Sequence, residues 1–308
     1  MERYEIAIVG AGPAGMTAAL YALRAGKRVL LLEGETYGGQ IVQSRMVENY
    51  PGAPEINGAE LAMKMMEPLT AMGLTVTPAK IESAVHAAYG EGFELTAEDG
   101  TGYSARAVIV ATGVGHRKLG VAGEERLIGR GISFCATCDG MFFRGREVAV
   151  VGGGNTAVQD ALVLAEICSR VYLIHRRDAF RAESHLVERM KANEKIEIIT
   201  DTVVTEVRGT MRPESLMLRN VRTEEVRELP IAGVFLAVGN VARNDAFRGL
   251  IDLDEVGFVL TDSDCKTSCA GIFAAGDCRQ KKVRQLTTAT SDGTIAALSA
   301  VEYLEGRA

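Results

Sequence analysis

The chain has 308 residues, of which 47% are hydrophobic and 24% are charged, and its formal net charge is −6. This length suits one large domain or two of ordinary size, and the apolar fraction supports a sizeable core without disulfide staples. The acidic balance argues against a dedicated nucleic-acid binder, and no apolar run is long enough to cross a bilayer. Six unevenly spaced cysteines are too few for the disulfide framework of a secreted protein, and the N-terminal MERYEIAIVG has no signal-peptide pattern. We therefore expect a cytoplasmic protein without nucleic-acid or membrane partners.

The first part of the chain predicts a dinucleotide-binding unit. A β-rich run over residues 4–9 ends in GAGPAG, a helical stretch follows, and a second apolar run ends in Glu33. In such a motif Gly10 permits the tight turn and Gly12 lets the backbone approach a pyrophosphate. The helix that follows presents free N–H groups to the phosphates, and Glu33 can accept hydrogen bonds from an adenosine ribose. This unit is typical of an FAD or NAD site.

The same pattern recurs from Gly152. EVAVVGGGNTA runs from a β-like segment through a glycine turn into a helix, and a second apolar run follows at the spacing of the first unit. Here the terminal acid is replaced by His175, Arg176 and Arg177, with Arg181 beyond them. Guanidinium groups pair with a 2′-phosphate, which a carboxylate would repel. The second unit is therefore interpreted as an NADP(H) site, the alternative being a solvated basic face.

Each unit continues into a short antiparallel excursion that returns to its sheet. The segments 93–113 and 215–239 both alternate in polarity and end in an apolar strand followed by glycine. The C-terminal piece, with GIFAAGDCRQ and a final helix, has no glycine motif of its own and is expected to complete the first sheet. The predicted fold class is α/β, with two Rossmann-like three-layer domains, the second inserted in the first. The predicted boundaries are 1–113 with 244–308 for the first domain and 114–243 for the second.

The segment FCATCDG contains two cysteines, Cys135 and Cys138, separated by two residues and followed by Asp139. A Cys-x-x-Cys pair can be half of a zinc site, a structural disulfide or a dithiol that cycles between oxidised and reduced states. A zinc site needs four ligands, and the only other close cysteine pair, Cys265 and Cys269, is assigned to the other domain. In a reducing compartment the pair is expected to be catalytic or metal-binding rather than structural.

Taken together, these segments resemble the low-molecular-weight, bacterial-type thioredoxin reductases, which use FAD and NADPH. The resemblance covers essentially the whole chain. It rests on the order and spacing of GAGPAG, ETYGGQ, ENYPG, VIVATG, GRGISFCATCDG, VVGGGNTA, HRRDAFRA, FAAGD and ATSDG.

The resemblance implies that the first domain binds FAD. The pyrophosphate, the adenosine ribose, the ribityl chain and the flavin ring would each be held by residues of that domain. These implied FAD residues are Gly10, Gly12, Pro13, Ala14, Glu33, Gly39, Gln40, Asn49, Ala111, Thr112, Gly113, Gly276, Asp277, Arg284 and Gln285. Asp277 also has an independent reason, because a carboxylate at the end of a strand faces the ligand crevice of such sheets. Asn49 alone would instead be interpreted as a turn residue before Pro51.

The resemblance also implies that the second domain binds NADPH and carries the redox dithiol. The implied NADPH residues are Gly152, Gly154, Asn155, Thr156, Ala157, His175, Arg176, Arg177 and Arg181. Cys135 and Cys138 would accept electrons from the reduced flavin and pass them to thioredoxin or a thioredoxin-like dithiol protein. Asp139 would be the acid–base residue, although it also suits a turn or a helix N-cap before Gly140. No metal is expected.

The implied mechanism needs movement, because the dithiol and the nicotinamide must both reach one flavin on the other domain. The resemblance implies a rotating second domain, with hinges near 113–115 and 239–243, and a homodimer. The second hinge contains GNVARND, where relatives usually carry a proline.

Four cysteines lie outside the implied dithiol. Cys168 and Cys278 are expected to be buried packing residues, whereas Cys265 and Cys269 are expected to be surface thiols, the alternative being a pair that forms under oxidation.

The same residues distinguish this chain from several related functions. Ferredoxin-dependent relatives lack the second nucleotide motif, ferredoxin–NADP reductases lack Cys-x-x-Cys, and peroxidase-linked flavoproteins carry an additional dithiol domain. A redox sensor that binds both nucleotides and signals through Cys135 and Cys138 without turnover is the alternative from a different class.

Overall fold

The structure is a computed structural model that describes residues 3–44, 46–53, 55–88 and 92–306. The chain divides into two compact units, Met1–Gly115 with Val241–Ala308 and His116–Asn240. The second unit is therefore an insertion in the first.

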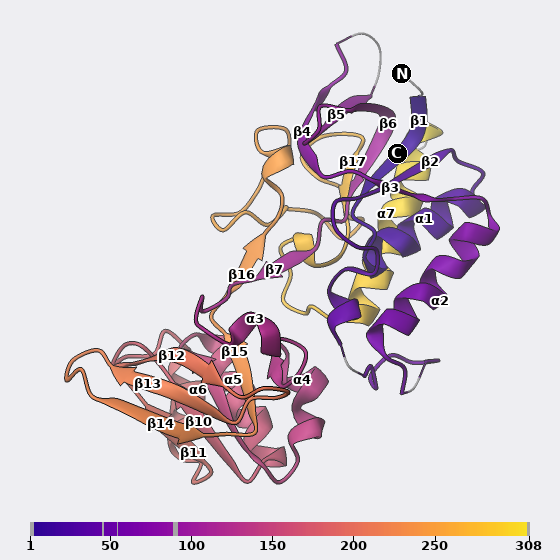
Figure 1. The fold of residues 1–308 in the computed structure, drawn as a ribbon. Helices are drawn as coiled ribbons and strands as arrows, with labels where there is room; N and C mark the ends of the chain where they lie inside the picture. The colour runs from indigo at the N-terminus through magenta and orange to yellow at the C-terminus, as the bar shows by residue number, and fades with distance from the viewer. Residues whose placement is uncertain (1–2, 45, 54, 89–91, 307–308) are drawn as a thin grey trace. The chain divides into compact units, whose positions relative to one another are not determined.

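The first unit is built on a mainly parallel sheet with strand order β3-β2-β1-β6-β5-β4, and β17 pairs with β6 (Figure 1). The strands are β1 (Arg3–Val9), β2 (Val29–Glu33), β3 (Val76–Pro78), β4 (Ile81–His86), β5 (Phe93–Ala97), β6 (Gly102–Val110) and β17 (Ile272–Ala274). Strands β4 and β5 are antiparallel additions, because β6 pairs with β5 through its first half and with β17 through its second half. The parallel strands end together, with Val9 beside Leu32 and Val110, and Val110 beside Ala274.

Helices cover one face of this sheet. They are α1 (Pro13–Arg24), α2 (Gly58–Ala71) and α7 (Leu286–Leu304). The unit also contains the 3₁₀ turns η1 (Gly39–Gln43), η3 (Asp245–Phe247) and η4 (Gly276–Cys278). Small residues of α1 and α7, such as Ala18 and Ala297, pack with Ile8 and Ile109 in one core cluster. The opposite face packs the alternate strand residues against the segment that contains Phe247. Alternation along β1 thus supplies two cores, as expected for a sheet that is covered on both faces.

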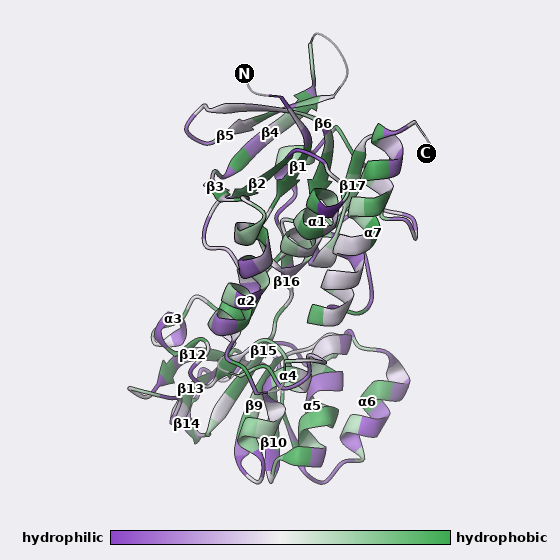
Figure 2. Ribbon diagram, turned by 90° about the vertical axis from the view of Figure 1, so that its right-hand side faces the viewer, coloured by the Kyte–Doolittle hydropathy of each residue, from purple (hydrophilic) through white to green (hydrophobic). Residues whose placement is uncertain are grey.

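The second unit has a parallel sheet with strand order β11-β10-β9-β15-β8. These strands are β8 (Ile132–Ser133), β9 (Glu147–Gly152), β10 (Arg170–Ile174), β11 (Ile196–Ile199) and β15 (Gly233–Ala237). One face packs on α5 (Asn155–Ile167) and α6 (Ser184–Lys191), and the other packs on an antiparallel sheet of β12 (Thr202–Arg208), β13 (Ser215–Asn220) and β14 (Val226–Pro230). The short elements α3 (Glu124–Leu127), α4 (Ala136–Asp139) and η2 (Gly140–Phe143) complete the unit. Figure 2 shows hydrophobic colouring along the inner strands and mixed colouring on α2 and α6.

The chain passes between the units twice, at β7 (Val114–His116) and β16 (Asn240–Ala242), and these two strands pair with each other. The predicted fold class is confirmed, since both units have the parallel sheet, the flanking helices and the antiparallel excursion. The assignment of FAD to one unit and NADPH to the other remains a proposal. Within the described residues, no helix combines the length and apolar character that a membrane span requires.

Candidate active site

The glycine turn of the first unit connects β1 to α1 at the edge where the parallel strands end. Gly10 has φ of +111°, and a Cβ there would lie 2.2 Å from the carbonyl oxygen of Ala111. A Cβ on Gly12, the N-cap of α1, would meet nothing closer than the Cα of Gly39 at 3.9 Å. The turn is thus compressed against the sheet at Gly10 and open at Gly12, where Pro13 begins the helix. An open helix N-terminus of this kind can accommodate a phosphate group.

Glu33 closes this turn from the end of β2. Its Oε2 accepts a hydrogen bond from the Ala11 N–H at 2.8 Å, and its Oε1 accepts one from the Glu35 N–H at 2.9 Å. Each oxygen retains further acceptor capacity, because a carboxylate offers about four lone-pair sites. The carboxylate is therefore fixed beside the glycine turn and can still bind hydroxyl groups of a ligand.

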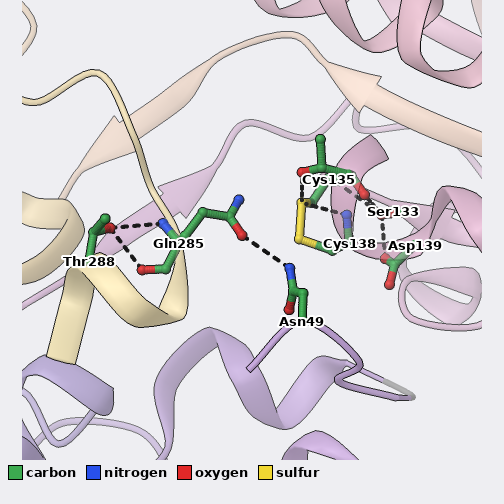
Figure 3. Close-up of a disulfide and its surroundings, with 8 residues drawn as sticks. Asn49, Ser133, Cys135, Cys138, Asp139, Gln285 and Thr288 are labelled. Atoms are coloured by element: carbon green, nitrogen blue, oxygen red, sulfur yellow. Dashed lines mark hydrogen bonds between the residues drawn. A yellow bond between two sulfur atoms is a disulfide. The ribbon is translucent and has the colours of Figure 1, made fainter. Parts of the chain in front are cut away.

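Other residues predicted to contact FAD come together although they lie far apart in the sequence. The Asn49 side chain donates to Gln285 Oε1 at 3.2 Å across 236 residues (Figure 3). Gln285 is the N-cap of α7, and its side chain and that of Thr288 form a capping box. The Gln40 side chain donates to the carbonyl oxygen of Val114 at 3.2 Å. The amides of Asn49 and Gln285 thus fix each other at the start of a long helix.

Asp277 is the most informative of these residues. It lies in η4, directly after β17 ends, and its Oδ1 is buried without a hydrogen-bond partner among the described residues. The ammonium group of Lys281 is 3.4 Å from that oxygen, and burial raises the pKa of the Asp277 carboxyl while Lys281 and Arg284 partly offset it. A buried carboxylate oxygen that has an ion-pair partner but no hydrogen bond, beside an open glycine turn, can accept a hydrogen bond from a hydroxyl group of a cofactor. The residues present therefore fit a dinucleotide at this edge.

Arg284 is held close to Asp277 by the backbone. It donates to the carbonyl oxygen of Lys281 at 3.1 Å, and its guanidinium lies 4.5 Å above the ring of Phe258. The remaining predicted FAD residues lie at the same strand ends: Ala14 in the first turn of α1, Ala111 to Gly113 after β6, and Gly276 at the start of η4. Thr112 donates to Asn244 Oδ1 at 2.7 Å, a contact that the sequence did not suggest.

The glycine turn of the second unit follows β9 and opens α5. A Cβ on Gly152 would lie 2.4 Å from the carbonyl oxygen of Ala237, and Gly154 has open space around it. Ala157 is fully buried, whereas Asn155 and Thr156 are exposed in the first turn of α5. Asn155 and Glu183 bind each other through two hydrogen bonds, at 2.8 and 3.0 Å.

His175 differs in environment from the arginines that follow it. The residue is 6% exposed. Its ring lies 5.2 Å from the ring of Phe180 in a stacked arrangement, and its Nε2 is 3.2 Å from the carbonyl oxygen of Ala179. Burial lowers the pKa of His175, and the charges of the neighbouring arginines lower it further. A Cβ on Gly153 would lie 2.1 Å from that ring, so the imidazole packs directly beneath the glycine turn.

Arg176, Arg177 and Arg181 are all exposed. None of the three makes an ion pair with another residue in the described part of the chain. Guanidinium groups without ion pairs to described residues, beside a glycine turn, have the chemistry that can bind a phosphate.

The two sulfurs of Cys135 and Cys138 are bonded to each other, at 2.02 Å. The disulfide closes the start of α4, where Cys135 is the N-cap and its Sγ accepts a hydrogen bond from the Cys138 N–H at 3.2 Å. Thr137 Oγ1 lies 3.4 Å from the same sulfur. Backbone N–H groups at a helix start favour a thiolate, so the local structure suits a reactive dithiol.

Asp139 ends the same helical turn. Its Oδ2 accepts a hydrogen bond from Ser133 Oγ at 2.5 Å, and burial raises the pKa of its carboxyl while that hydrogen bond lowers it (Figure 3). A carboxyl whose pKa is raised keeps its proton at a higher pH than an ordinary aspartate, which favours a part in proton exchange. Ser133 lies in the segment GRGISFCATCDG, and its only signal in the sequence is a hydroxyl two residues before Cys135.

The remaining cysteines correct one prediction. Cys168 and Cys278 are buried as expected, but Cys265 is also fully buried, and burial raises the pKa of its thiol to about 12. Arg279 donates to its sulfur at 2.9 Å, so the expectation of a surface thiol was wrong. Cys269 is half-buried, with its sulfur 3.7 Å from His86 Nε2. Among the described residues, no group of three or more His, Cys, Asp and Glu side chains could hold a metal ion.

Comparison with known proteins gives the family. Residues 4–293 match the family described as pyridine nucleotide-disulphide oxidoreductase. A thioredoxin reductase of Listeria innocua is 43% identical over 304 residues, which cover 98% of this chain and 94% of that protein. The crystal structure of thioredoxin reductase from Streptococcus pyogenes is 42% identical, covers 99% of both chains and superimposes with a TM-score of 0.93. The thioredoxin reductase structure from Lactococcus lactis is 41% identical, covers 98% of this chain and 99% of that chain, and has a TM-score of 0.68. With its two glycine turns and its Cys135–Cys138 disulfide, this chain belongs to the pyridine nucleotide-disulphide oxidoreductases.

Proposed function

We propose that the protein is a thioredoxin-disulfide reductase that uses FAD and NADPH. The observation that carries this proposal is the Cys135–Cys138 disulfide at the start of α4, with Asp139 in the same turn. The relatives named above carry the name thioredoxin reductase, and the match extends over nearly their whole length. The net reaction oxidises NADPH to NADP⁺ and, with one further proton, reduces a protein disulfide to a dithiol.

The first unit is proposed to hold FAD, which when bound would carry electrons from the nicotinamide to the disulfide. The open turn at Gly12 and the first turn of α1 would receive the pyrophosphate, and Glu33 would bind the adenosine ribose. Asp277 Oδ1, which makes no hydrogen bond with the described residues, would accept one from a ribityl hydroxyl. Gln40, Asn49, Arg284 and Gln285 would lie along the cofactor towards its ring.

The second unit is proposed to hold NADPH. The glycine turn at Gly152 and Gly154, with the exposed start of α5, would receive its pyrophosphate. Arg176, Arg177 and Arg181 would bind the 2′-phosphate, which distinguishes NADPH from NADH. His175 would support the turn from beneath rather than bind the phosphate, because its ring is buried.

At the dithiol, two electrons break the S–S bond between Cys135 and Cys138, and two protons complete the two thiols. One cysteine, as thiolate, attacks the disulfide of the partner and forms a mixed disulfide, which releases one partner sulfur as a thiolate. The second cysteine then attacks the first, restores the disulfide and releases the reduced partner. Asp139 is proposed to give a proton to the departing sulfur and to take one from the attacking thiol.

The partner is proposed to be thioredoxin or a thioredoxin-like dithiol protein, and the enzyme is proposed to act as a homodimer in the cytoplasm. A compartment that keeps thiols reduced suits a dithiol that cycles. The relatives named above that carry the name thioredoxin reductase come from bacteria.

The test follows NADPH and NADH oxidation in parallel, using the purified yellow protein, thioredoxin and a terminal disulfide acceptor. Oxidation should require thioredoxin, prefer NADPH and disappear in Cys138→Ser. Cys269→Ser is the matched control, because it removes a half-buried thiol outside the dithiol and should leave turnover unchanged. A protein that binds both nucleotides without turnover would favour the redox sensor, and reduction of thioredoxin by ferredoxin but not by NADPH would overturn the assigned electron donor.

A further inference from the structure

Ser133 connects the backbone of Cys135 to the side chain of Asp139. It ends β8, its side chain is 6% exposed, and its Oγ accepts a hydrogen bond from the Cys135 N–H at 3.0 Å. The same Oγ lies 2.5 Å from Asp139 Oδ2 and 3.4 Å from the Cys135 carbonyl oxygen. A hydroxyl can donate only one hydrogen bond, and the short distance indicates that Ser133 donates it to the Asp139 carboxylate.

We propose that Ser133 is a positioning residue for proton transfer at the dithiol, where it fixes one oxygen of Asp139 and leaves the other free for the cysteine sulfurs. This inference rests on the proposed function. Asp139 Oδ1 makes no hydrogen bond with any residue that the structure describes. The carboxylate is thus held on one side by a group that is itself anchored to the N-cap of the dithiol helix.

Ser133 also opposes the effect of burial on Asp139. Burial raises the pKa of this carboxyl, and the Ser133 hydrogen bond lowers it, because that bond stabilises the charged form. The elements packed against α4 are η2, which has no charged residue, and α5, which carries Asp160 and Glu166. Glu166 is exposed, but burial raises the pKa of Asp160 to about 7, so Asp160 must be separated from Asp139 in any titration.

The first experiment titrates Asp139 directly in the oxidised FAD-containing enzyme, by ¹³C NMR of protein labelled at the aspartate carboxyl carbon. Asp139→Asn and Asp160→Asn assign the two resonances. Ser133→Ala should move the Asp139 titration to higher pH, whereas Ser133→Thr, which keeps the hydroxyl, should restore it. An unchanged titration in Ser133→Ala would overturn the proposal, and this result does not depend on which protein the enzyme reduces.

The second experiment measures single-turnover oxidation of the reduced dithiol by oxidised thioredoxin across pH. Ser133→Ala should slow this step roughly tenfold, the loss expected for one hydrogen bond to a charged group, and move its pH profile upward. In the Asp139→Asn background Ser133→Ala should cost little more, because the two residues act as one unit. Equal losses in both backgrounds would mean that Ser133 acts only on local structure. Failure of thioredoxin to oxidise even the wild-type dithiol would instead count against the proposed function and leave the NMR result standing.

Discussion

The ammonium group of Lys281 lies 2.9 Å from Asp292 Oδ2, which joins the segment after β17 to helix α7. Arg279 binds the other oxygen of Asp292 at 3.2 Å, and the Gly276 N–H donates to Oδ2 at 3.1 Å. The three charged side chains are each only 13% exposed. Asp292 is therefore the common acceptor that fixes the backbone on both sides of Asp277.

Asp292→Asn should destabilise the first unit and weaken its hold on FAD. Removing one partner of a buried ion pair leaves the other charge uncompensated and costs about 3 kcal/mol or more. Because Lys281 also contacts Asp277, the loss should reach the proposed ribityl contact. We expect a lower melting temperature and a lower FAD content after dialysis.

Lys80→Met is the matched control for this experiment. It breaks an ion pair with Glu98 in the same unit, at 3.3 Å, but both side chains there are more than half exposed. Exposed pairs contribute less than about 1 kcal/mol, so melting temperature and FAD content should stay near those of the wild type. Equal losses of melting temperature and FAD content in both variants would contradict the proposal that Asp292 fixes the backbone around Asp277.

The double variant Arg176→Ala, Arg177→Ala should change the choice of nicotinamide cofactor. Each guanidinium is exposed and free of ion pairs with described residues, so each can bind a phosphate at about 1.5–3 kcal/mol. We expect KM for NADPH to rise at least about tenfold, while KM for NADH stays nearly constant. Steady-state kinetics with both cofactors measures the split.

Arg170→Ala tests whether such an effect is specific. Arg170 begins β10, whose other end leads to Arg176, and it pairs with Glu197 at 2.7 Å. Loss of this exposed guanidinium should leave both KM values unchanged. A comparable rise in KM for NADPH would point to the general charge of the unit rather than to a phosphate site.

Local patterns were sufficient to predict the glycine turns, because such motifs constrain the backbone at the motif itself. Gly10 takes its positive φ where the sequence predicts the turn, and the expected helix follows as α1, from Pro13 to Arg24. The fold class followed from the repetition of this pattern. Which nucleotide each turn binds stays a prediction, because the arrangement of the residues is consistent with the assignment but does not test it.

Contacts between distant segments could not be predicted in this way. Cys265 lies in a polar stretch and suggested an exposed thiol, but its burial comes from Arg279 and from helix α7. The bond between Asn49 and Gln285 spans 236 residues, and only the resemblance placed both residues near one cofactor. His175 occupies the position of the acid in the first unit, and the sequence could not reveal that its ring turns inward beneath Gly153.

A disulfide between the two linkers should slow turnover without releasing FAD. His116 Nδ1 and Asn240 Oδ1 are 3.1 Å apart on the paired strands β7 and β16, so these two positions are chosen for the pair His116→Cys and Asn240→Cys. Rotation at these linkers is itself a prediction from the mechanism. Turnover with thioredoxin should fall on oxidation and recover on selective reduction, with flavin content unchanged.

The single variants His116→Cys and Asn240→Cys are the controls for that crosslink. Each removes the same side chain but forms no disulfide, so each should keep its turnover under oxidising conditions. A crosslinked protein that turns over at the rate of its reduced form would exclude a hinge in the paired strands β7 and β16.

Asp160 should make the stability of the second unit depend on pH. Burial on α5 raises the pKa of its carboxyl from 3.8 to about 7, so the folded protein holds a proton there that the unfolded chain has already released. The free energy of unfolding is therefore highest below about pH 4, falls as the pH rises towards 7 and stays at its lower value above that. The total loss is about 4 kcal/mol as an upper estimate. Asp160→Asn cannot ionise and should raise the melting temperature by several degrees at pH 8, with a much smaller change at pH 5.

Glu166→Gln is the matched control, because it neutralises an exposed carboxylate on the same helix. Thermal unfolding of the two variants and the wild type at pH 5 and pH 8 gives the comparison. The Glu166→Gln protein should follow the wild type at both pH values, since its carboxylate is already in water. If Asp160→Asn raised the melting temperature equally at both pH values, the gain would come from packing or hydrogen bonding, and Asp160 would not be the group that titrates near neutral pH.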